Sequence, residues 1–167
     1  TIHTTNFTVS QYRDTTFVDW KTAGSGTGKT YESFLITGYE LFNDAMREKS
    51  IPYIWFYFTR TEDGFSDAGS SDFTLDNPSS CKVQAQWQWA NHANSGKWGT
   101  EFQAYRLNRL YTPTGASDAF NYGEDVIVTK NKLRGSGKAL SLYIKSETGK
   151  DMKLLGWAVQ AIAQSKG

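Results

Sequence analysis

The sequence predicts an all-β fold, an antiparallel β-sandwich that is jelly-roll-like, with about eight strands and at most one short helix. Aromatic residues make up 15% of the chain, and such residues favour pleated, half-buried surfaces. Residues 81–89 alternate strictly between apolar and polar side chains. Clusters of Gly, Asn, Ser and Pro separate the apolar runs, as expected for strands joined by turns.

Two runs give the clearest strands. In residues 81–89 every odd position is apolar or aromatic and every even position is Lys or Gln, which predicts a half-buried strand with Trp87 and Trp89 facing the core. Residues 53–59 are apolar on both faces, which predicts a central strand covered on both sides. The other expected strands are residues 7–9, 34–38, 102–111, 126–129, 139–145 and 152–162.

The C-terminal part of the chain predicts a hairpin that closes the sandwich. Gly135 and Gly137 flank Ser136 and permit positive φ in a tight turn. An apolar row follows on each of two strands, with Gly149 turning the chain between them. The members of the two rows are Leu140, Leu142 and Ile144, then Leu155, Trp157 and Val159. Residues 39–49 are the one segment that could form a helical turn or two.

The length of 167 residues predicts a single domain, residues 1–167, because such a chain buries roughly two thirds of its unfolded surface. Its only cysteine is Cys81, which excludes an internal disulfide and a two-cysteine metal site. No apolar run approaches the ~20 residues that span a bilayer, and the start lacks a signal-peptide pattern. Because the first residue is Thr1 rather than Met, we expect processing or a fragment of a longer polypeptide.

Charge is distributed unevenly along the chain. The net charge is +1, but residues 1–125 hold fifteen Asp and Glu against ten Lys and Arg, whereas residues 126–167 hold two against eight. This is either a simple surface asymmetry or a device by which unlike patches orient subunits that meet head to tail.

A glycine-rich segment, AGSGTGKT at residues 23–30, has the letters of a phosphate-binding loop with Lys29 and Thr30 at its end. A working loop needs an apolar strand before it and a helix after it. Asp19 and Lys21 interrupt the preceding run, and the residues after the segment predict a strand. We therefore interpret the segment as a flexible hairpin tip and expect no nucleotide cofactor.

Other reactive residues do not converge on a site. His3 and His92 have no ligand-like spacing to Cys81, which we expect to be a small core residue. A nucleophilic pair of Cys81 and His92 is an alternative that needs a contact the sequence does not predict. Residues 62–76 form an acidic segment, which we expect to be solvated; calcium binding or a carboxylate pair for glycoside hydrolysis are alternatives. We predict no catalytic residue and no metal site.

Three residues are weak candidates for binding. Trp98 lies in a turn, Ser-Gly-Lys-Trp-Gly, and is the aromatic side chain most expected to be exposed. Arg134 and Lys138 belong to the basic segment of residues 130–138, which could touch phosphate. We expect this segment to be a solvated loop or an intersubunit contact, because a nucleic-acid module concentrates more charge.

Residues 31–49, 77–111 and 126–159 together resemble the C-terminal, β-rich region of structural tail proteins of tailed bacteriophages. The last block carries the resemblance most clearly, with Arg-Gly-Ser-Gly-Lys at residues 134–138, an alternating strand, Gly-Lys-Asp at 149–151 and Leu-Leu-Gly-Trp at 154–157. The similarity runs from Phe17 to Val159. In similar proteins this region can follow a longer, often propeller-like part, so the chain is expected to be a fragment of, or companion to, a larger virion protein.

The resemblance implies a non-enzymatic virion component, most plausibly of a nozzle-like or hub-like ring in the tail, assembled in the host cytoplasm. Its expected partners are other virion proteins and copies of itself, with no small-molecule substrate, no cofactor and no membrane. Nucleic-acid binding is not expected, although DNA could pass close to the basic C-terminal part. The alternative is a carbohydrate-binding or host-receptor-recognition domain that uses exposed aromatic rings such as Trp98.

Overall fold

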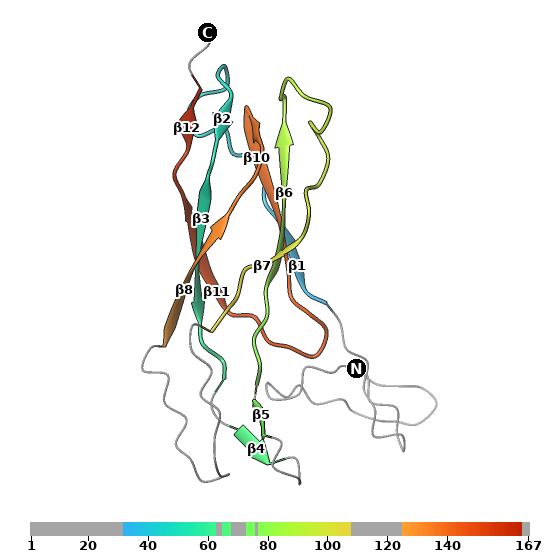
Figure 1. Ribbon diagram of the computed structural model, residues 1–167, viewed down its shortest axis with the longest axis vertical. Helices are drawn as coiled ribbons and strands as arrows, with labels where there is room; N and C mark the ends of the chain where they lie inside the picture. Colours follow the sequence, from blue (N-terminus) through green and yellow to red (C-terminus); the bar gives the residue numbers. More distant parts are fainter. Residues whose placement is uncertain (1–31, 63–64, 68–72, 76, 108–124, 165–167) are drawn as a thin grey trace, which may run out of the picture.

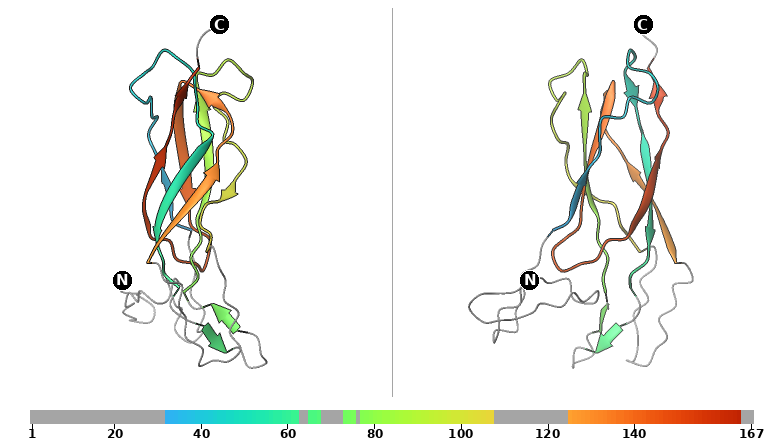
Figure 2. Two further views of the ribbon diagram at one scale, coloured as in Figure 1. Left: turned by 60° about the vertical axis from the view of Figure 1, so that its left-hand side comes forward. Right: turned by 180° about the vertical axis from the view of Figure 1, so that it is seen from behind.

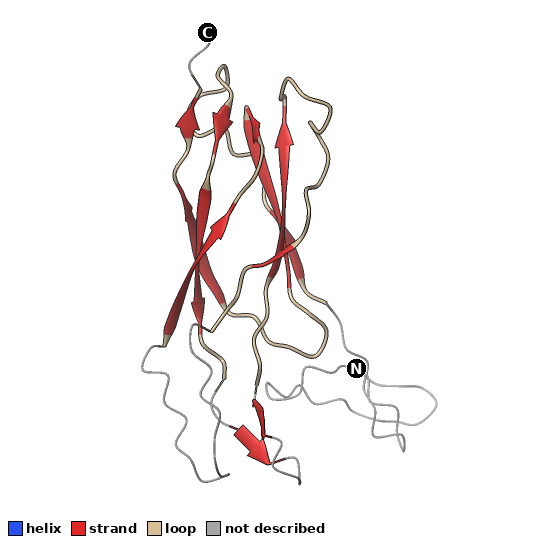
Figure 3. Ribbon diagram, in the orientation of Figure 1, coloured by secondary structure: helices blue, strands red, loops and turns tan. Residues whose placement is uncertain are grey.

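The computed structural model describes residues 32–62, 65–67, 73–75, 77–107 and 125–164, and every regular element in these ranges is a β-strand. Figure 3 shows the strands with no helix among them. Two antiparallel sheets face each other along the long axis of the molecule (Figure 1). The predicted all-β antiparallel sandwich is confirmed.

Each of the two main sheets is named here after its long central strand. The β6 sheet has the order β1-β10-β6-β7 and the β3 sheet has the order β11-β3-β8. The strands of the β6 sheet are β1 (Phe34–Ile36), β10 (Ala139–Lys145), β6 (Lys82–Gln88) and β7 (Phe102–Gln103). Those of the β3 sheet are β11 (Leu154–Val159), β3 (Tyr53–Thr59) and β8 (Val126–Lys132).

Short strands lie at both ends of the sandwich (Figure 2). A small sheet of order β12-β2-β9 lies at the end where the chain terminates, and a β4-β5 hairpin lies at the other end. Their bounds are β12 (Ile162–Ala163), β2 (Lys49–Ser50), β9 (Ser136–Gly137), β4 (Phe65–Asp67) and β5 (Phe73–Leu75).

Strand positions follow the apolar runs closely in the centre of the chain. Both β3 and β10 have the expected bounds, and β6 begins and ends one residue inside its expected run. The expected strand at residues 152–162 divides into β11 and β12, and among the described residues of 102–111 only Phe102–Gln103 form a strand. The expected helical turns at residues 39–49 are a turn and bends that lead into β2. Residues 7–9 and 23–30 lie outside the described residues.

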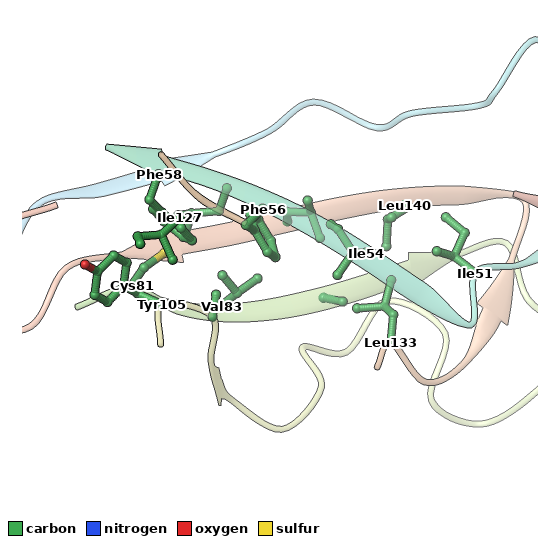
Figure 4. Close-up of a cluster of buried hydrophobic side chains, with 14 of the residues drawn as sticks. Ile51, Ile54, Phe56, Phe58, Cys81, Val83, Tyr105, Ile127, Leu133 and Leu140 are labelled. Atoms are coloured by element: carbon green, nitrogen blue, oxygen red, sulfur yellow. The ribbon is translucent and has the colours of Figure 1, made fainter. Parts of the chain in front are cut away.

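The core lies between the two sheets and is filled by alternate residues of their long strands (Figure 4). From β3, the side chains of Ile54, Phe56 and Phe58 are fully buried. They face the inner residues of β6 and β10, including Val83 and Ile144, which are also fully buried. Burying each side chain of this size stabilises the fold by about 1.5–3 kcal/mol.

The outer side of β3 differs from the prediction that both faces of this strand are covered. Tyr53 and Tyr57 are 38% and 36% exposed, and Trp55 is half-buried. No described element packs over this side of the β3 sheet. The run is apolar on both faces, but only one of them is buried within this chain.

The two tryptophans of the 81–89 run also differ from each other. Trp87 is 5% exposed and donates a hydrogen bond from Nε1 to the carbonyl oxygen of Arg134 at 3.0 Å. The prediction that Trp89 faces the core with it is wrong, since this residue is 56% exposed. The strand ends at Gln88, and the φ of Trp89 is +53°, so the backbone leaves the period-two pattern before the second ring.

The predicted terminal hairpin is wrong, because β10 and β11 belong to opposite sheets. The row on β10 faces the core as expected. In β11 a register shift between Leu154 and Gly156 interrupts the second row, and Leu155 is 61% exposed. Of the two turn glycines only Gly135 has a positive φ, since Gly137 pairs in β9.

An ion-pair network joins β6 and β10 to the neighbouring loops. Glu101 binds Lys145 at 2.7 Å and Lys82 at 3.5 Å, and Glu147 binds Lys82 at 2.9 Å and Lys150 at 3.1 Å. A hydrogen bond from the hydroxyl of the buried Ser80 is the largest cause that lowers the pKa of Glu147 to about 2, followed by the bonds from the two lysines.

Replacing Gly135 by alanine should destabilise the protein more than replacing Gly149. A Cβ at Gly135 would lie 2.6 Å from Cδ1 of the buried Trp87, and its φ is +101°. Gly149 has a φ of +75° but nothing within 4 Å. We expect a loss of about 2–4 kcal/mol for G135A and about 1–2 kcal/mol for G149A, measured by urea unfolding. Equal losses would contradict the packing described for Trp87.

Removing the Glu147 carboxylate should weaken the acid sensitivity of the fold. Because folding lowers this pKa from 4.5 to about 2, the stabilisation is present above pH 4.5 and is lost as the pH falls toward 2. We expect E147Q to be less stable than the wild type at neutral pH and to lose less stability over that interval. Thermal melts as a function of pH measure this, with E40Q as an exposed control that should follow the wild type.

Candidate binding surfaces

The outer apolar face is the name used here for Trp55, Tyr57, Val126 and Val128 on the uncovered side of the β3 sheet. Antiparallel pairing places Tyr57 opposite Val128, so the two side chains lie on the same face. Val126 and Val128 are each 44% exposed. These four neighbouring apolar side chains form one continuous surface on the uncovered side of the sheet.

Small residues border this face on the side of β11. Gly156 lies opposite Tyr57 and Ala158 lies opposite Trp55. A Cβ at Gly156 would meet no heavy atom within 4 Å. The Tyr57 ring is therefore open on the side of β11.

A second set of exposed rings, called the aromatic row, crosses the outer side of the β6 sheet. The Trp98 ring lies 5.8 Å from the Tyr143 ring, and the Tyr143 ring lies 5.7 Å from the Phe34 ring. Phe34 is 65% exposed and Trp98 is 39% exposed. The expectation that Trp98 is exposed is confirmed, and β1 and β10 supply its aromatic neighbours.

The glutamines of β6 hold Trp98 in place. Trp98 forms an isolated bridge with Gln86, whose Nε2 donates to the carbonyl oxygen of Gly96 at 2.7 Å. Nε2 of Gln84 donates to the carbonyl oxygen of Gly99 at 3.0 Å. These side chains do face away from the core as predicted, but they anchor the 96–99 loop rather than only contacting water.

Arg134 and Lys138 do not join Trp98 within the described residues. The carbonyl oxygen of Arg134 accepts the bond from Trp87, and its side chain is exposed. The backbone N–H of Lys138 donates to Gln88, and its carbonyl oxygen accepts from Nζ of Lys49 at 3.1 Å. The main-chain atoms of Arg134 and Lys138 therefore hold residues 134–138 to neighbouring parts of the fold. The three candidates do not form one site.

Cys81 and His92, the two residues considered as a reactive pair, lie far apart in the structure. Cys81 is fully buried, and this burial raises the pKa of its thiol to about 12. His92 lies beyond the opposite end of β6, roughly 20 Å or more along the strand, and its Nε2 contacts the carbonyl oxygen of Ser136 at 3.1 Å. The alternative of a Cys81–His92 nucleophilic pair is therefore wrong.

The acidic segment of residues 62–76 is partly within the fold. The expectation that Glu62 is solvated is wrong, because it is 3% exposed and accepts bonds from the Tyr105 hydroxyl at 2.5 Å and the Ser79 N–H at 2.9 Å. Asp63, Asp72 and Asp76 lie outside the described residues. In the described part of the chain no three His, Cys, Asp or Glu residues gather as metal ligands.

The glycine-rich segment of residues 23–30 also lies outside the described residues. The first described strand after it is β1, Phe34–Ile36, which pairs with β10. A phosphate-binding loop leads into a helix whose N-terminus faces the phosphate. The element after this segment therefore lacks the geometry that such a loop requires.

Sequence reasoning missed the outer apolar face, although a signal for it was present. Within residues 53–58 the odd positions carry Tyr, Trp and Tyr, whereas the even positions carry Ile, Phe and Phe. Tyr and Trp are typical of surfaces that are apolar but partly wet. That difference separates an exposed face from a buried one even where both faces are apolar.

No helix in the described residues is long and apolar enough to cross a membrane. Comparisons with protein-family models, with curated proteins and with solved structures found no match to this chain.

Proposed function

We propose that this chain is a non-enzymatic structural component of a bacteriophage virion, most plausibly of the tail, and that it assembles by packing against copies of itself and neighbouring virion proteins. The observation that supports assembly is the outer apolar face. On the side of the β3 sheet that faces away from the core, Tyr57, Val126 and Val128 are 36–44% exposed.

The composition of this face suits a subunit interface. Aromatic residues are enriched at the centres of interfaces, and Trp and Tyr supply much of the binding energy there. Trp55 and Tyr57 occupy the central strand of the β3 sheet, at the middle of this face. The uneven charge along the chain supplies complementary patches that can orient one subunit on the next.

The assignment to a phage tail rests on the resemblance carried by residues 31–49, 77–111 and 126–159. A β-sandwich is compatible with that role. The fold alone serves many functions, so the assembly surface and the resemblance carry the proposal together.

Self-association should depend on the outer apolar face. We expect the wild-type chain to form oligomers that mass photometry or light scattering resolves, and V128E to weaken association by about a hundredfold, since it places a charge at the centre of an apolar interface. W98S changes an exposed ring on the opposite sheet and should leave association unchanged. A chain that stays monomeric at high concentration, or V128E oligomers equal to the wild type, would count against self-assembly.

A second candidate function is carbohydrate binding, favoured by the aromatic row. Trp98, Tyr143 and Phe34 form adjacent rings on the outer side of the β6 sheet, and no described element covers them. Such rings offer flat surfaces on which the apolar faces of sugars can stack.

The aromatic row can be tested with a glycan array. If it binds sugar, W98A should lose the signal of any bound glycan about tenfold or more, because one stacked ring contributes on the order of 1–2 kcal/mol. W157A removes a partly exposed tryptophan from the other sheet and serves as the matched control. An array without signal for the wild type, or equal loss in both variants, would exclude this surface as a sugar site.

A further inference from the structure

A shallow open groove runs between the edge strands of the two sheets, on the side of the sandwich where β7 and β8 lie. It has a volume of about 690 Å³. The residues that line it are Tyr53, Phe102, Gln103, Arg106, Lys130, Asn131 and Lys132. The groove is thus built from the free edge of β8 and from the segment that begins with β7.

The groove is strongly basic. Three of its lining residues are cations, Arg106, Lys130 and Lys132, and none of the lining residues is acidic. Every described ion pair lies elsewhere, and none involves these three side chains. Three cations that converge without a carboxylate partner in the described structure repel one another, and an anion between them relieves that repulsion.

A series of hydrogen bonds through buried polar side chains fixes the guanidinium of Arg106 at the groove. Its Nη2 donates to the carbonyl oxygen of Lys130 at 3.0 Å and to Oδ1 of Asn131 at 2.6 Å. Asn131 is 4% exposed, and its Nδ2 donates to Oγ1 of Thr129, which is 3% exposed, at 3.2 Å. Burying two polar side chains is costly unless they are hydrogen-bonded. Here the hydrogen bonds that satisfy them also orient Arg106, whose Nε and Nη1 make no bond within the described residues.

Lys130 is also held in place. Its Nζ lies 4.0 Å from the centre of the Tyr53 ring and 5.5 Å from the centre of the Trp55 ring, a cation–π arrangement. Ordering a long side chain before binding reduces the entropy that binding would otherwise lose. Two of the three cations are therefore preorganised, and Tyr53 and Phe102 add apolar surface beside them.

We propose that this groove binds an anionic polysaccharide through the carboxylate or sulfate groups of its sugars. An open groove accepts an internal stretch of a polymer, whereas a closed pocket accepts only a small molecule or a chain end. The cations bind the charged groups, and Phe102 contacts the apolar faces of the sugar rings. The site is separate from the aromatic row and does not rest on the assembly role, and it adjoins the outer apolar face where Lys130 lies over Trp55.

Nucleic acid fits the groove less well. Proteins that bind nucleic acid without sequence preference use many phosphate contacts and aromatic rings with free faces for base stacking. This groove has three cations, and Lys130 already occupies a face of Tyr53. The whole chain has a net charge of only +1, far from the basic character of a nucleic-acid module.

Calorimetric titrations at physiological ionic strength test the proposal with four probes: polygalacturonate, dextran sulfate, neutral dextran and a thymidine oligonucleotide. We expect binding of one or both acidic polysaccharides and none of neutral dextran. R106A and K132E should each weaken that binding about tenfold or more, the effect of losing a charge-assisted contact. K153E makes the same charge change at an exposed lysine away from the groove and should retain wild-type affinity.

Thermal melts show whether each variant is folded. If R106A does not fold, K132E still tests the proposal, because the Lys132 side chain is exposed and makes no described hydrogen bond or ion pair. Three results would overturn the proposal: no binding of either acidic polysaccharide, equal weakening by K132E and K153E, or tighter binding of the oligonucleotide than of both polysaccharides. If K132E loses polysaccharide binding but still forms oligomers, binding in the groove and assembly are separate properties.

Discussion

The packing of one side of β3 against β6 and β10 is the constraint on which the rest of the structure depends. Ile54, Phe56 and Phe58 are fully buried there, and the Phe58 ring meets the Tyr105 ring edge-on at 5.2 Å. Strict alternation along a strand means that burying these three residues directs Tyr53, Trp55 and Tyr57 outward. The exposed aromatic surface is thus the geometric counterpart of the core and cannot be removed by a shift of register without inverting the sheet.

Buried polar groups in this sandwich fix loops and surface side chains rather than a reaction centre. Glu62 accepts bonds from Tyr105 and Ser79 and so ties the segment after β3 to the residues before β6. Asn131 orients Arg106 at the groove. In both cases a satisfied hydrogen-bonding group inside the protein determines the position of a neighbouring segment, which is a common route to a uniquely ordered structure.

The fold class and the long strands could be predicted from the sequence, because periodicity reports which residues share a face. It reports less about what lies over that face. Residues 53–59 predict a strand covered on both sides because both faces are apolar, and only the choice of Tyr and Trp on one face marks that face as exposed. Trp89 is misplaced because the pattern continues one residue past the point where its φ turns positive. The groove could not be foreseen, since Arg106 and Lys130 are brought together only where the edges of the two sheets meet.

The arrangement at the free edge of β8 has a consequence for solubility. No described strand pairs with the outer edge of β8, and a seven-residue strand with such an edge is a template on which another extended chain can add. Here the Arg106 guanidinium occupies the carbonyl oxygen of Lys130, and two lysines project from the same strand. A strand that added to this edge would have to displace the Arg106 guanidinium and bury the two positively charged lysines. The molecule can therefore expose the outer apolar face and still resist the edge-to-edge strand addition that leads to fibrils.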